Sequence, residues 1–353
     1  MQSPIRMAIF LPTWVGDCCM ATPTLRAIRR GFPRAQITAV MRPVIADLLD
    51  QAWGEAPAWY DEMVMVPKKT LRGRLAVAQQ LRQQQIDVGV LLTNSLWSAA
   101  AVRISGAPAR IGYARDGRGW LLTSALRPLK VGRVYQPVPH IDYLLAIAEH
   151  MGCPASDRRM QLAVTDDGWT LRRRLLARIG WDESAAVAVI NNGAATQPDR
   201  IWPEERVRRL ALDLAEQRGL HVLLHCGPAD RESANRIAAQ IHHPRVASMG
   251  LVEELPIALS KAVLASARVV ISTDSGPRHI AAALDRPVVA LFGATGAEWT
   301  RTYNVPEQIV TPPSGDEAIA MPRAAGPRAG MARISVEQVL AAVDQAMASA
   351  AAA

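Results

Sequence analysis

The chain alternates short apolar runs with longer stretches of helical apolar spacing, and this alternation recurs in both halves. Each run is five to seven residues long and mainly apolar, which is typical of buried strands. The runs lie at residues 7–11, 37–41, 88–92, 186–190, 221–227, 269–273 and 287–293. Strands that alternate with helices favour parallel sheets with crossover helices. The pattern therefore predicts an α/β chain with two doubly wound, Rossmann-like domains that face each other across a cleft.

Domain limits follow from where the pattern weakens. Residues 140–152 have helical spacing, and the stretch 154–167 resembles a connection between halves. Beyond Pro306 the alternation fades through a segment rich in Pro, Gly and Ala, and helical spacing returns near residue 334. We expect an N-terminal domain at 1–165 and a C-terminal domain at 166–335. A terminal helix with a frayed tail is expected at 336–353.

Composition adds few constraints. The chain has 353 residues, of which 50% are hydrophobic and 20% charged, as in ordinary folded proteins. The best candidate for a membrane span, residues 280–293, is interrupted by Asp285 and Arg286 and is shorter than the roughly 18 apolar residues required. The N-terminal segment lacks the pattern of a secretory leader. We expect a cytoplasmic protein.

Charge is distributed unevenly along the chain. The net charge is +8, and residues 1–170 carry 20 Lys and Arg against 13 Asp and Glu, whereas the remainder is almost balanced. A basic half suggests an anionic partner. Aromatic residues make up only 5% of the chain, which leaves few stacking platforms for single-stranded nucleic acid. A phosphorylated glycan or an anionic membrane surface is favoured, and no nucleic acid is expected.

Three common kinds of site are not predicted. Cys18, Cys19, Cys153 and Cys226 show no metal-ligand spacing, so we interpret them as reduced thiols and expect no metal. The chain also lacks the glycine pattern of dinucleotide-binding folds and the Walker pattern of ATPases. We expect no cofactor.

Ligands of doubly wound sheets bind outside the carboxyl ends of the strands, so the segments that follow the apolar runs are candidate sites. After the first run, Gly16 permits an unusual backbone and Asp17 follows it in the predicted loop. Thr22 and Pro23 resemble a helix start, with the threonine as N-cap. Asp17 is a candidate carboxylate base. A capping role is the structural alternative.

The segment after residue 190 is polar. Asn192, Gly193 and Thr196 extend a loop, and Arg200 precedes Trp202 and a proline that opens the next helix. A guanidinium at a strand exit can grip phosphate oxygens as a rigid fork. A surface ion pair is the alternative for Arg200.

The segment after residue 273 is the most informative. Asp274, Ser275 and Gly276 form a tight turn, and a helix is expected to start at Pro277. The unbonded N–H groups of a helix start favour a phosphate. His279 lies one turn into that helix, where it can face the same anion or hold the Asp274 loop.

Together these segments resemble the glycosyltransferase family of ADP-heptose:lipopolysaccharide heptosyltransferases (glycosyltransferase family 9), particularly its heptosyltransferase II branch. The motifs that carry the resemblance are PTWVGDCCMATPTLRAIRRGFP, ARIGYARDGRGWLLT, HIDYLLAIAEHMG, RIWPEER and STDSGPRHIAAALDRPVVALFGAT with the following RTYN. The resemblance implies a GT-B fold, with the nucleotide sugar held mainly by the C-terminal domain. It also implies inverting transfer without a metal.

The resemblance also implies roles for individual residues. Asp17 matches the base that removes the proton of the acceptor hydroxyl, and Arg200 stands where the family usually has a lysine that binds the donor diphosphate. Other diphosphate contacts are expected from Asp274, Ser275, Gly276 and His279. Contacts of the donor nucleotide and its loops are expected from Asn192, Gly193, Thr196, Gly227 and Glu232. Acceptor contacts are expected from Arg115 and Arg118.

The implied partners are ADP-heptose as donor and the heptose-bearing inner core of phosphorylated lipid A as acceptor. The basic N-terminal half would then make peripheral contact with the anionic inner face of the inner membrane. Three alternatives remain open at this point. They are a GT-B transferase for another nucleotide sugar or glycan, a sugar-nucleotide epimerase, and a non-catalytic binding module.

Overall fold

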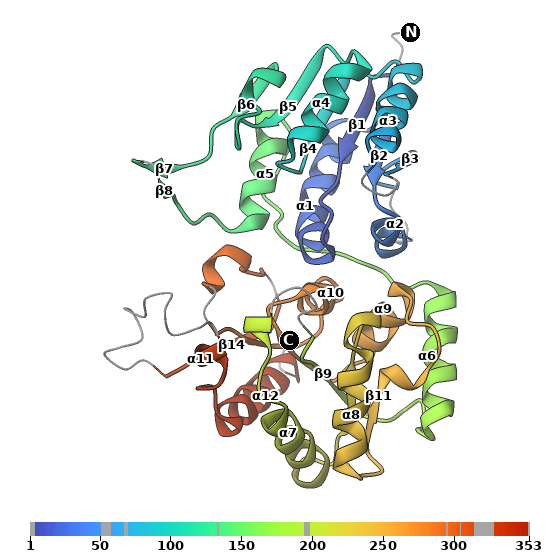
Figure 1. Ribbon diagram of the computed structural model, residues 1–353, viewed down its shortest axis with the longest axis vertical. Helices are drawn as coiled ribbons and strands as arrows, with labels where there is room; N and C mark the ends of the chain where they lie inside the picture. Colours follow the sequence, from blue (N-terminus) through green and yellow to red (C-terminus); the bar gives the residue numbers. More distant parts are fainter. Residues whose placement is uncertain are drawn as a thin grey trace. The chain divides into compact units, whose positions relative to one another are not determined.

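The computed structural model describes residues 4–50, 58–66, 70–132, 134–193, 198–293, 296–303, 305–313 and 328–351. The chain divides into two compact units, shown in blue to green and in green to red in Figure 1. The first unit consists of Met1–Ala163 and Glu298–Tyr303. The second consists of Val164–Ala297 and Asn304–Ala353.

The first unit is built on a six-stranded sheet among its described residues. All of its paired strands run parallel, in the order β3-β2-β1-β4-β5-β6. The strands are β1 (Arg6–Phe10), β2 (Gln36–Met41), β3 (Glu62–Met65), β4 (Val88–Leu91), β5 (Ala109–Tyr113) and β6 (Ser124–Leu126). The central strands are almost wholly buried, as expected of a parallel sheet that is covered on both faces.

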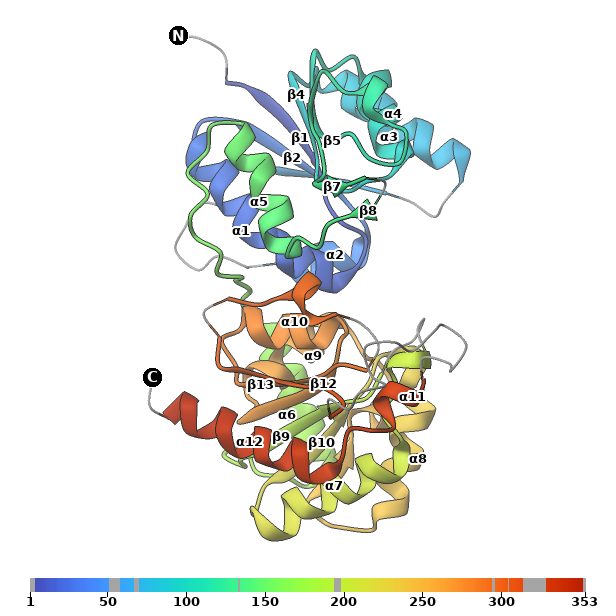
Figure 2. The same cartoon turned by 90° about the vertical axis from the view of Figure 1, so that its left-hand side faces the viewer.

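Helices cover both faces of this sheet. Helices α1 and α5 pack together on one face, and α3 and α4 pack together on the other (Figure 2). The helices are α1 (Val15–Gly31), α2 (Pro43–Leu49), α3 (Leu71–Gln83), α4 (Leu96–Ser105), η1 (Gly119–Leu121) and α5 (His140–His150). A separate antiparallel hairpin joins β7 (Lys130–Val131) to β8 (Val134–Tyr135).

Helix α1 begins earlier than the sequence predicted. It starts at Val15, so Asp17 lies in its first turn rather than in a loop, and Pro23 lies inside the helix. A proline within a helix leaves the carbonyl four residues earlier without its amide donor, which here is the carbonyl of Cys19. The hydroxyl of Thr22 donates to that carbonyl at 2.7 Å. Thr22 therefore compensates for Pro23 in mid-helix and is not an N-cap.

The second unit repeats the topology of the first. Its described residues form a six-stranded parallel sheet in the order β11-β10-β9-β12-β13-β14. The strands are β9 (Val187–Asn191), β10 (His221–His225), β11 (Val246–Ser248), β12 (Val269–Thr273), β13 (Val288–Leu291) and β14 (Glu307–Val310). The apolar pattern did not predict β3, β5, β6, β11 or β14, because these strands are short or only partly buried and lack a continuous apolar run.

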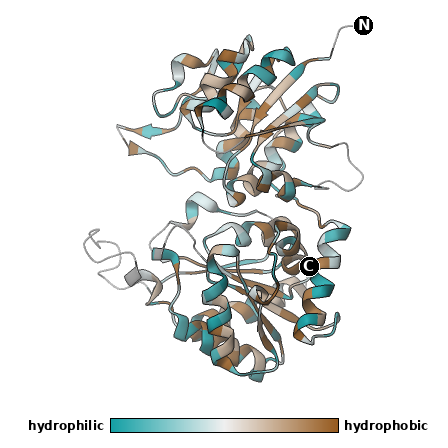
Figure 3. Ribbon diagram, turned by 45° about the vertical axis from the view of Figure 1, so that its right-hand side comes forward, coloured by the Kyte–Doolittle hydropathy of each residue, from teal (hydrophilic) through white to brown (hydrophobic). Residues whose placement is uncertain are grey.

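Helices of the second unit also form two layers. Helix α9 packs against α6 and α10, and α7 packs against α8 and α12. The helices are α6 (Asp166–Ile179), η2 (Pro198–Arg200), α7 (Glu204–Gln217), η3 (Pro228–Asp230), α8 (Arg231–Ile241), η4 (Met249–Leu251), α9 (Ile257–Ala265), α10 (Gly276–Ala283), η5 (Ala297–Thr300), α11 (Arg328–Met331) and α12 (Val336–Ala351), with η5 lying mostly in the first unit. Apolar residues concentrate in the strands of both sheets (Figure 3).

Local capping chemistry fixes several helix ends. Ser95 and Thr165 accept hydrogen bonds from the first-turn amides of α4 and α6. Both helices end at a glycine in the left-handed conformation, Gly106 with φ of 85° and Gly180 with φ of 73°. Within the described part of the chain, no helix combines the length and apolar character needed to cross a membrane.

Candidate active site

A row of buried polar side chains runs along the carboxyl ends of the central strands in the second unit. The amide nitrogen of Asn191, at the end of β9, donates to the hydroxyls of Ser272 at 3.1 Å and Ser275 at 2.8 Å. Its carbonyl oxygen lies 3.2 Å from Nδ1 of His225, at the end of β10. Nε2 of His225 lies 3.1 Å from the hydroxyl of Ser260. The row thus connects three strand ends with α9.

The protonation state of His225 follows from this row. Burial lowers the pKa of His225 to about 4, so its imidazole is neutral at pH 7. Because Nδ2 of Asn191 donates to both serines, the Oδ1 atom of Asn191 is the acceptor that faces the histidine. Nδ1 of His225 therefore carries the proton, and Nε2 accepts from Ser260. This assignment directs an oxygen lone pair of Ser275, not its proton, toward Asn191.

Ser275 is the N-cap of α10. Its backbone is extended, with φ of −151°, and its side chain makes no capping hydrogen bond. The helix begins with Gly276 and Pro277, so its first turn combines amides without helical partners and a residue that has no amide hydrogen. The N-terminus of such a helix is a favourable place for a phosphate, because amide hydrogens and the helix dipole point toward it.

Arg200 lies at the end of η2 and is held by Asp274. Its Nη1 atom lies 3.0 Å from Oδ2 of Asp274 and donates to the carbonyl of the same residue. The Arg200 side chain is 28% exposed, whereas that of Asp274 is 6% exposed. Within the described residues, Nε of Arg200 is buried without a hydrogen-bond partner. The guanidinium is thus fixed at one end and retains donors for a ligand.

Asp274 is the centre of a larger ionic cluster. Its Oδ1 atom lies 3.3 Å from Nη1 of Arg278, which is fully buried, and 4.0 Å from Nε2 of His279. Arg278 also pairs with both carboxylate oxygens of Glu307 on β14, at 2.7 and 3.0 Å. An ionised carboxylate only accepts hydrogen bonds and repels another anion, so Asp274 is poorly suited to bind a phosphate directly. The cluster suits a positioning role for Asp274 and His279.

The loop residues predicted for the donor nucleotide have mixed environments. The amide of Asn192 forms two 2.9 Å hydrogen bonds to the main chain of Trp202, which fixes the loop rather than leaving Asn192 available. Gly193 lies so close to Asp230 that an added Cβ would sit 2.6 Å from a carboxylate oxygen. Thr196 lies outside the described residues.

Two other predicted positions follow β10. Gly227 precedes η3, and an added Cβ there would meet open space. Glu232 lies in the first turn of α8 and is exposed. Between them, Asp230 has a raised pKa because it is partly buried. The loop after β10 thus presents two carboxylates and an uncovered stretch of backbone.

In the first unit, Asp17 lies in the first turn of α1, after β1. Burial is the main cause of a raised pKa at the neighbouring Cys18, and Asp17 and Cys19 add to it. The pKa of His140 is lowered, mainly by burial. The charge of Asp17 opposes that shift, while Arg115 increases it. Asp17, Arg115 and His140 therefore share one electrostatic neighbourhood within this unit.

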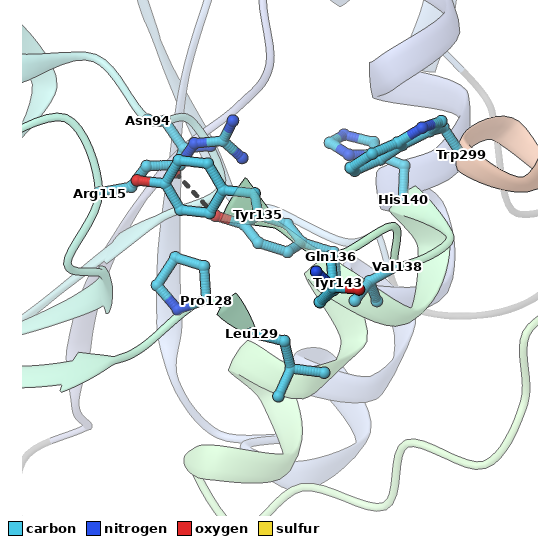
Figure 4. Close-up of a pocket in the computed structure, with 10 residues that line it drawn as sticks. All are labelled: Asn94, Arg115, Pro128, Leu129, Tyr135, Gln136, Val138, His140, Tyr143 and Trp299. Atoms are coloured by element: carbon cyan, nitrogen blue, oxygen red, sulfur yellow. Dashed lines mark hydrogen bonds between the residues drawn. The ribbon is translucent and has the colours of Figure 1, made fainter. Parts of the chain in front are cut away.

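A pocket of about 180 Å³ opens beside this group. Figure 4 shows its lining, which comes from the segments after β4 and β5, the β7–β8 hairpin, α5 and the segment that contains Trp299. Tyr143 donates to Oδ1 of Asn94 at 3.2 Å, and His140 stacks parallel to Tyr143. Within the described residues, Nε2 of His140 is buried without a hydrogen-bond partner. An aromatic wall with unused polar groups is typical of a sugar-binding pocket.

The two arginines expected to contact the acceptor differ sharply. Arg115 lines the pocket, with its guanidinium 4.4 Å from the centre of the Tyr135 ring. Arg118 is 0% exposed, and its guanidinium donates to the carbonyls of Tyr113, Thr93 and Ser95. The expectation that Arg118 touches the acceptor is therefore wrong, because its donors are consumed by the main chain. Its Nη2 atom also donates to Asn94 at 3.2 Å, so it supports the pocket indirectly.

Sequence reasoning missed several residues that build these sites. Asn94 follows β4, so the rule of strand exits could have found it. The pattern of the sequence gives no signal for Trp299, which joins the first unit through a segment whose Tyr303 donates to Asp142 on α5. His225 lies within a predicted apolar run, so the sequence pattern gave no sign that its buried side chain takes part in a polar row.

The remaining expectations about sites concern thiols and metals. All four cysteines are buried thiols that form no disulfide. Across the residues that the structure describes, no group of three or more His, Cys, Asp or Glu side chains is arranged to hold a metal ion.

Comparison with known sequences identifies relatives along most of the chain. The sequence model of glycosyltransferase family 9 (heptosyltransferase) matches residues 74–318. The chain is 25% identical over 317 residues to lipopolysaccharide heptosyltransferase 2 of Escherichia coli K12, covering 84% of this chain and 85% of that protein. It is 29% identical over 316 residues to lipopolysaccharide heptosyltransferase 1 of Pseudomonas aeruginosa PAO1, covering 85% and 81%.

Solved structures show the same fold. A glycosyltransferase family 9 protein from Veillonella parvula DSM 2008 superposes with a TM-score of 0.79 at 19% identity and covers 99% of each chain. ADP-heptose lipopolysaccharide heptosyltransferase II from E. coli superposes with a TM-score of 0.74 at 20% identity, covering 97% and 99%. The expected GT-B fold is confirmed. With the family match covering most of its length, this chain belongs to glycosyltransferase family 9, the heptosyltransferase family.

Proposed function

We propose that this protein is an inverting, metal-independent heptosyltransferase. It moves L-glycero-D-manno-heptose from ADP-heptose to the heptose of the lipopolysaccharide inner core. Family membership and relatives named lipopolysaccharide heptosyltransferase support the donor and the acceptor class. The observation that carries the proposal is the ion pair between Arg200 and Asp274. Asp274 lies two residues before Gly276, the first residue of α10, and the N-terminus of this helix is a favourable place for a phosphate.

The second unit would hold the donor. Arg200, the hydroxyl of Ser275 and the amide of Gly276 would bind the diphosphate, while Asp274 and His279 keep these groups in place. The segments with Asn192 and Gly193, and with Gly227 and Glu232, would surround the nucleoside. As ADP leaves, negative charge grows on the diphosphate, and fixed donors stabilise it without reorganising. In this proposal Arg200 and the N-terminus of α10 stabilise the diphosphate charge, which a bound metal ion would otherwise stabilise.

The first unit would hold the acceptor and the base. Asp17 removes the proton of the acceptor hydroxyl, and the hydroxyl oxygen attacks C1 of the heptose. The bond from C1 to the diphosphate oxygen breaks with its electron pair leaving on ADP, so the anomeric configuration inverts. The pocket bounded by Arg115, His140 and Tyr143 would seat the acceptor sugar, and Arg115 would meet a phosphate on it.

The surroundings of the acceptor extend the proposal. Lipid A is anchored in a membrane, so an enzyme acting on its inner core would work in the cytoplasm at the inner face of the inner membrane. The excess of positive charge in residues 1–170 suits contact with anionic lipids and phosphorylated acceptor.

The test is a transfer assay followed by mass spectrometry. The native protein is incubated with ADP-heptose and a lipid A inner-core acceptor that carries one heptose, with and without a chelator. We expect a product heavier by one heptose residue, unaffected by the chelator, with an inverted anomeric centre by NMR. A panel of other nucleotide sugars serves as the donor control.

Other results would contradict the proposal in distinct ways. Product from another nucleotide sugar alone would replace the donor. Isomerisation of ADP-heptose in the absence of acceptor would indicate an epimerase. Intact ADP binding with no turnover of any donor would indicate a binding module.

A further inference from the structure

The β7–β8 hairpin of the first unit exposes apolar side chains beside the pocket. Val131 and Val134 are 69% and 67% exposed, and Leu129 is exposed as well. Figure 1 shows the hairpin projecting from the body of the unit that carries it. Large apolar side chains at such exposure gain free energy by moving out of water.

The strand pairing gives this hairpin two chemically different faces. Val131 pairs with Val134 directly across the ladder, and Lys130 pairs with Tyr135. Side chains of successive residues in a strand point to opposite faces. The two valines therefore share one face, while Lys130 and Tyr135 share the other. Tyr135 lines the pocket, whereas the two valines are not among its lining residues.

Positive charge lies on the opposite face of the hairpin and in the residues just before it. The ammonium of Lys130 lies 4.2 Å from the centre of the Tyr135 ring, where Arg115 also lies. Arg127, just before the hairpin, is exposed. Asp116 lies 3.8 Å from Nε of Arg115 and offsets that charge. Residues 117–141 contain no Asp or Glu, so no acidic side chain of the hairpin segment itself offsets Arg127 and Lys130. A hairpin with exposed valines on one face and a cation on the other matches the interface of an anionic bilayer, in which acyl chains lie beneath negative head groups.

We propose that the β7–β8 hairpin inserts Val131 and Val134 into the interface of an anionic membrane and so presents the adjoining pocket to a lipid-anchored acceptor. This inference rests on the proposed function for the identity of the acceptor, but not for the membrane contact. A protein partner fits less well, because two strands of two residues offer little of the roughly 800 Å² that each side of a stable protein interface buries. The pocket wall includes Pro128, Leu129 and Gln136 from the same segment, so docking the hairpin also positions the pocket.

The experiment measures flotation of the full chain with vesicles that contain no glycan. One set consists of phosphatidylcholine with phosphatidylglycerol, and the other of phosphatidylcholine alone. We expect binding to the anionic set, reduced by high salt. The double variant Val131→Ser with Val134→Ser should bind about tenfold more weakly, because the buried apolar area is lost while the charges remain.

A matched control keeps the result specific. Leu71 and Leu75 on α3 are exposed apolar residues of the same unit, and changing both to serine should leave vesicle binding unchanged. ADP affinity of each variant, measured by calorimetry, confirms that the chain is folded. The proposal is overturned if the hairpin variant binds vesicles as well as the native chain does, or if the Leu71 and Leu75 control loses as much binding as the hairpin variant. It is also overturned if the native chain does not bind anionic vesicles.

Vesicle binding and heptose transfer can fail separately. Vesicle binding requires no donor and no transfer. Hairpin-dependent binding without heptose transfer would leave the membrane surface standing and reject the activity. The hairpin variant should transfer heptose to a water-soluble acceptor fragment at the native rate but lose transfer to an acceptor embedded in vesicles. This combination would support both the membrane surface and the transfer activity.

Discussion

The two units share one strand order but differ in how the polar groups at their sheet edges are arranged. In the second unit, the polar groups at the strand ends are buried and joined, from Ser260 through His225 and Asn191 to Ser275. In the first unit, the corresponding edge borders a pocket, and Nε2 of His140 has no partner among the described residues. A hydrogen-bond network fixes its side chains in one geometry, whereas polar groups that lack a hydrogen-bond partner at a pocket are able to bind a ligand.

The difference matches the two tasks that a transferase must perform. A diphosphate needs donors fixed in advance, since reorganising them during bond cleavage would cost free energy. A pocket for a glycan acceptor needs polar groups that are satisfied only when the sugar arrives. In the proposed reaction, the same topology would thus serve a rigid anion site in one unit and an open pocket in the other.

The largest expected effect tests whether the base belongs to the first unit alone. Asp17→Asn should reduce the rate of heptose transfer about 1,000-fold, because the amide cannot take the proton of the acceptor hydroxyl. ADP affinity, measured by calorimetry, should stay within about twofold, since the diphosphate site lies in the other unit. A large loss of ADP affinity would show that Asp17 acts on the donor or on the fold, and would remove the distinction between the units.

The next effect tests the fixed cation of the second unit. Arg200→Ala should lower kcat/KM for the donor about 100-fold and weaken ADP binding, because the growing negative charge loses its guanidinium. Arg200→Lys should recover part of the loss, since an ammonium keeps the charge without the fork. Arg209→Ala is the matched control, because Arg209 is an exposed arginine of the same unit that pairs with Glu337. Equal rates for Arg200→Ala and the control would reduce Arg200 to an ordinary surface ion pair.

These two predictions rest on residues that the sequence could identify, and the reason is physical. Asp17, Arg200 and Asp274 each follow an apolar run, and strand exits are where ligands of doubly wound sheets bind. The central strands of both sheets were predictable because buried parallel strands read as continuous apolar runs. The partly buried β14 lacks such a run, and with it the buried pairing of Glu307 with Arg278 escaped prediction.

Residues whose roles depend on distant contacts could not be predicted. Arg118 resembled a surface cation until the structure showed its guanidinium among main-chain carbonyls. Thr22 and Pro23 fitted a helix start, but the hydroxyl of Thr22 satisfies the carbonyl that Pro23 leaves without a donor. Trp299 reaches the pocket of the first unit from a segment far along the chain. Local pattern carries no information about such pairings.

A smaller effect tests the buried row of the second unit through its pH dependence. The pKa of His225 is about 4 in the folded chain, below the usual value of 6.5. The unfolded chain therefore takes up the proton first as the pH falls, and stability present above pH 6.5 is lost progressively toward pH 4. Between pH 7 and pH 5 the loss from this group should be about 2 kcal/mol.

Urea unfolding of the native chain and of His225→Asn at both pH values checks this prediction. The native chain should lose about 2 kcal/mol more than the variant, since all other titrating groups are common to the two. The variant should also bind ADP more weakly at pH 7, because Asn191 and Ser275 lose their support. If the free energy of unfolding of the native chain and of the variant depends on pH in the same way, His225 has the same pKa in the folded and the unfolded chain.

The smallest effect concerns the open pocket of the first unit and is confined to the acceptor. His140→Ala should raise the KM for acceptor about tenfold, because the sugar loses a hydrogen bond to the buried Nε2 atom. ADP affinity should not change, and His140→Asn should recover part of the loss by offering a polar group at the pocket wall. His150→Ala is the matched control, since His150 lies at the other end of α5 and is exposed, with its Nε2 atom 2.7 Å from the hydroxyl of Ser124.

If KM for acceptor is the same in both alanine variants, His140 is only a packing residue, and the pocket must recognise the sugar through Arg115 and Tyr143. If ADP affinity falls with His140→Ala, the contrast between a pre-formed donor site and an open acceptor pocket does not hold, because one histidine would serve both.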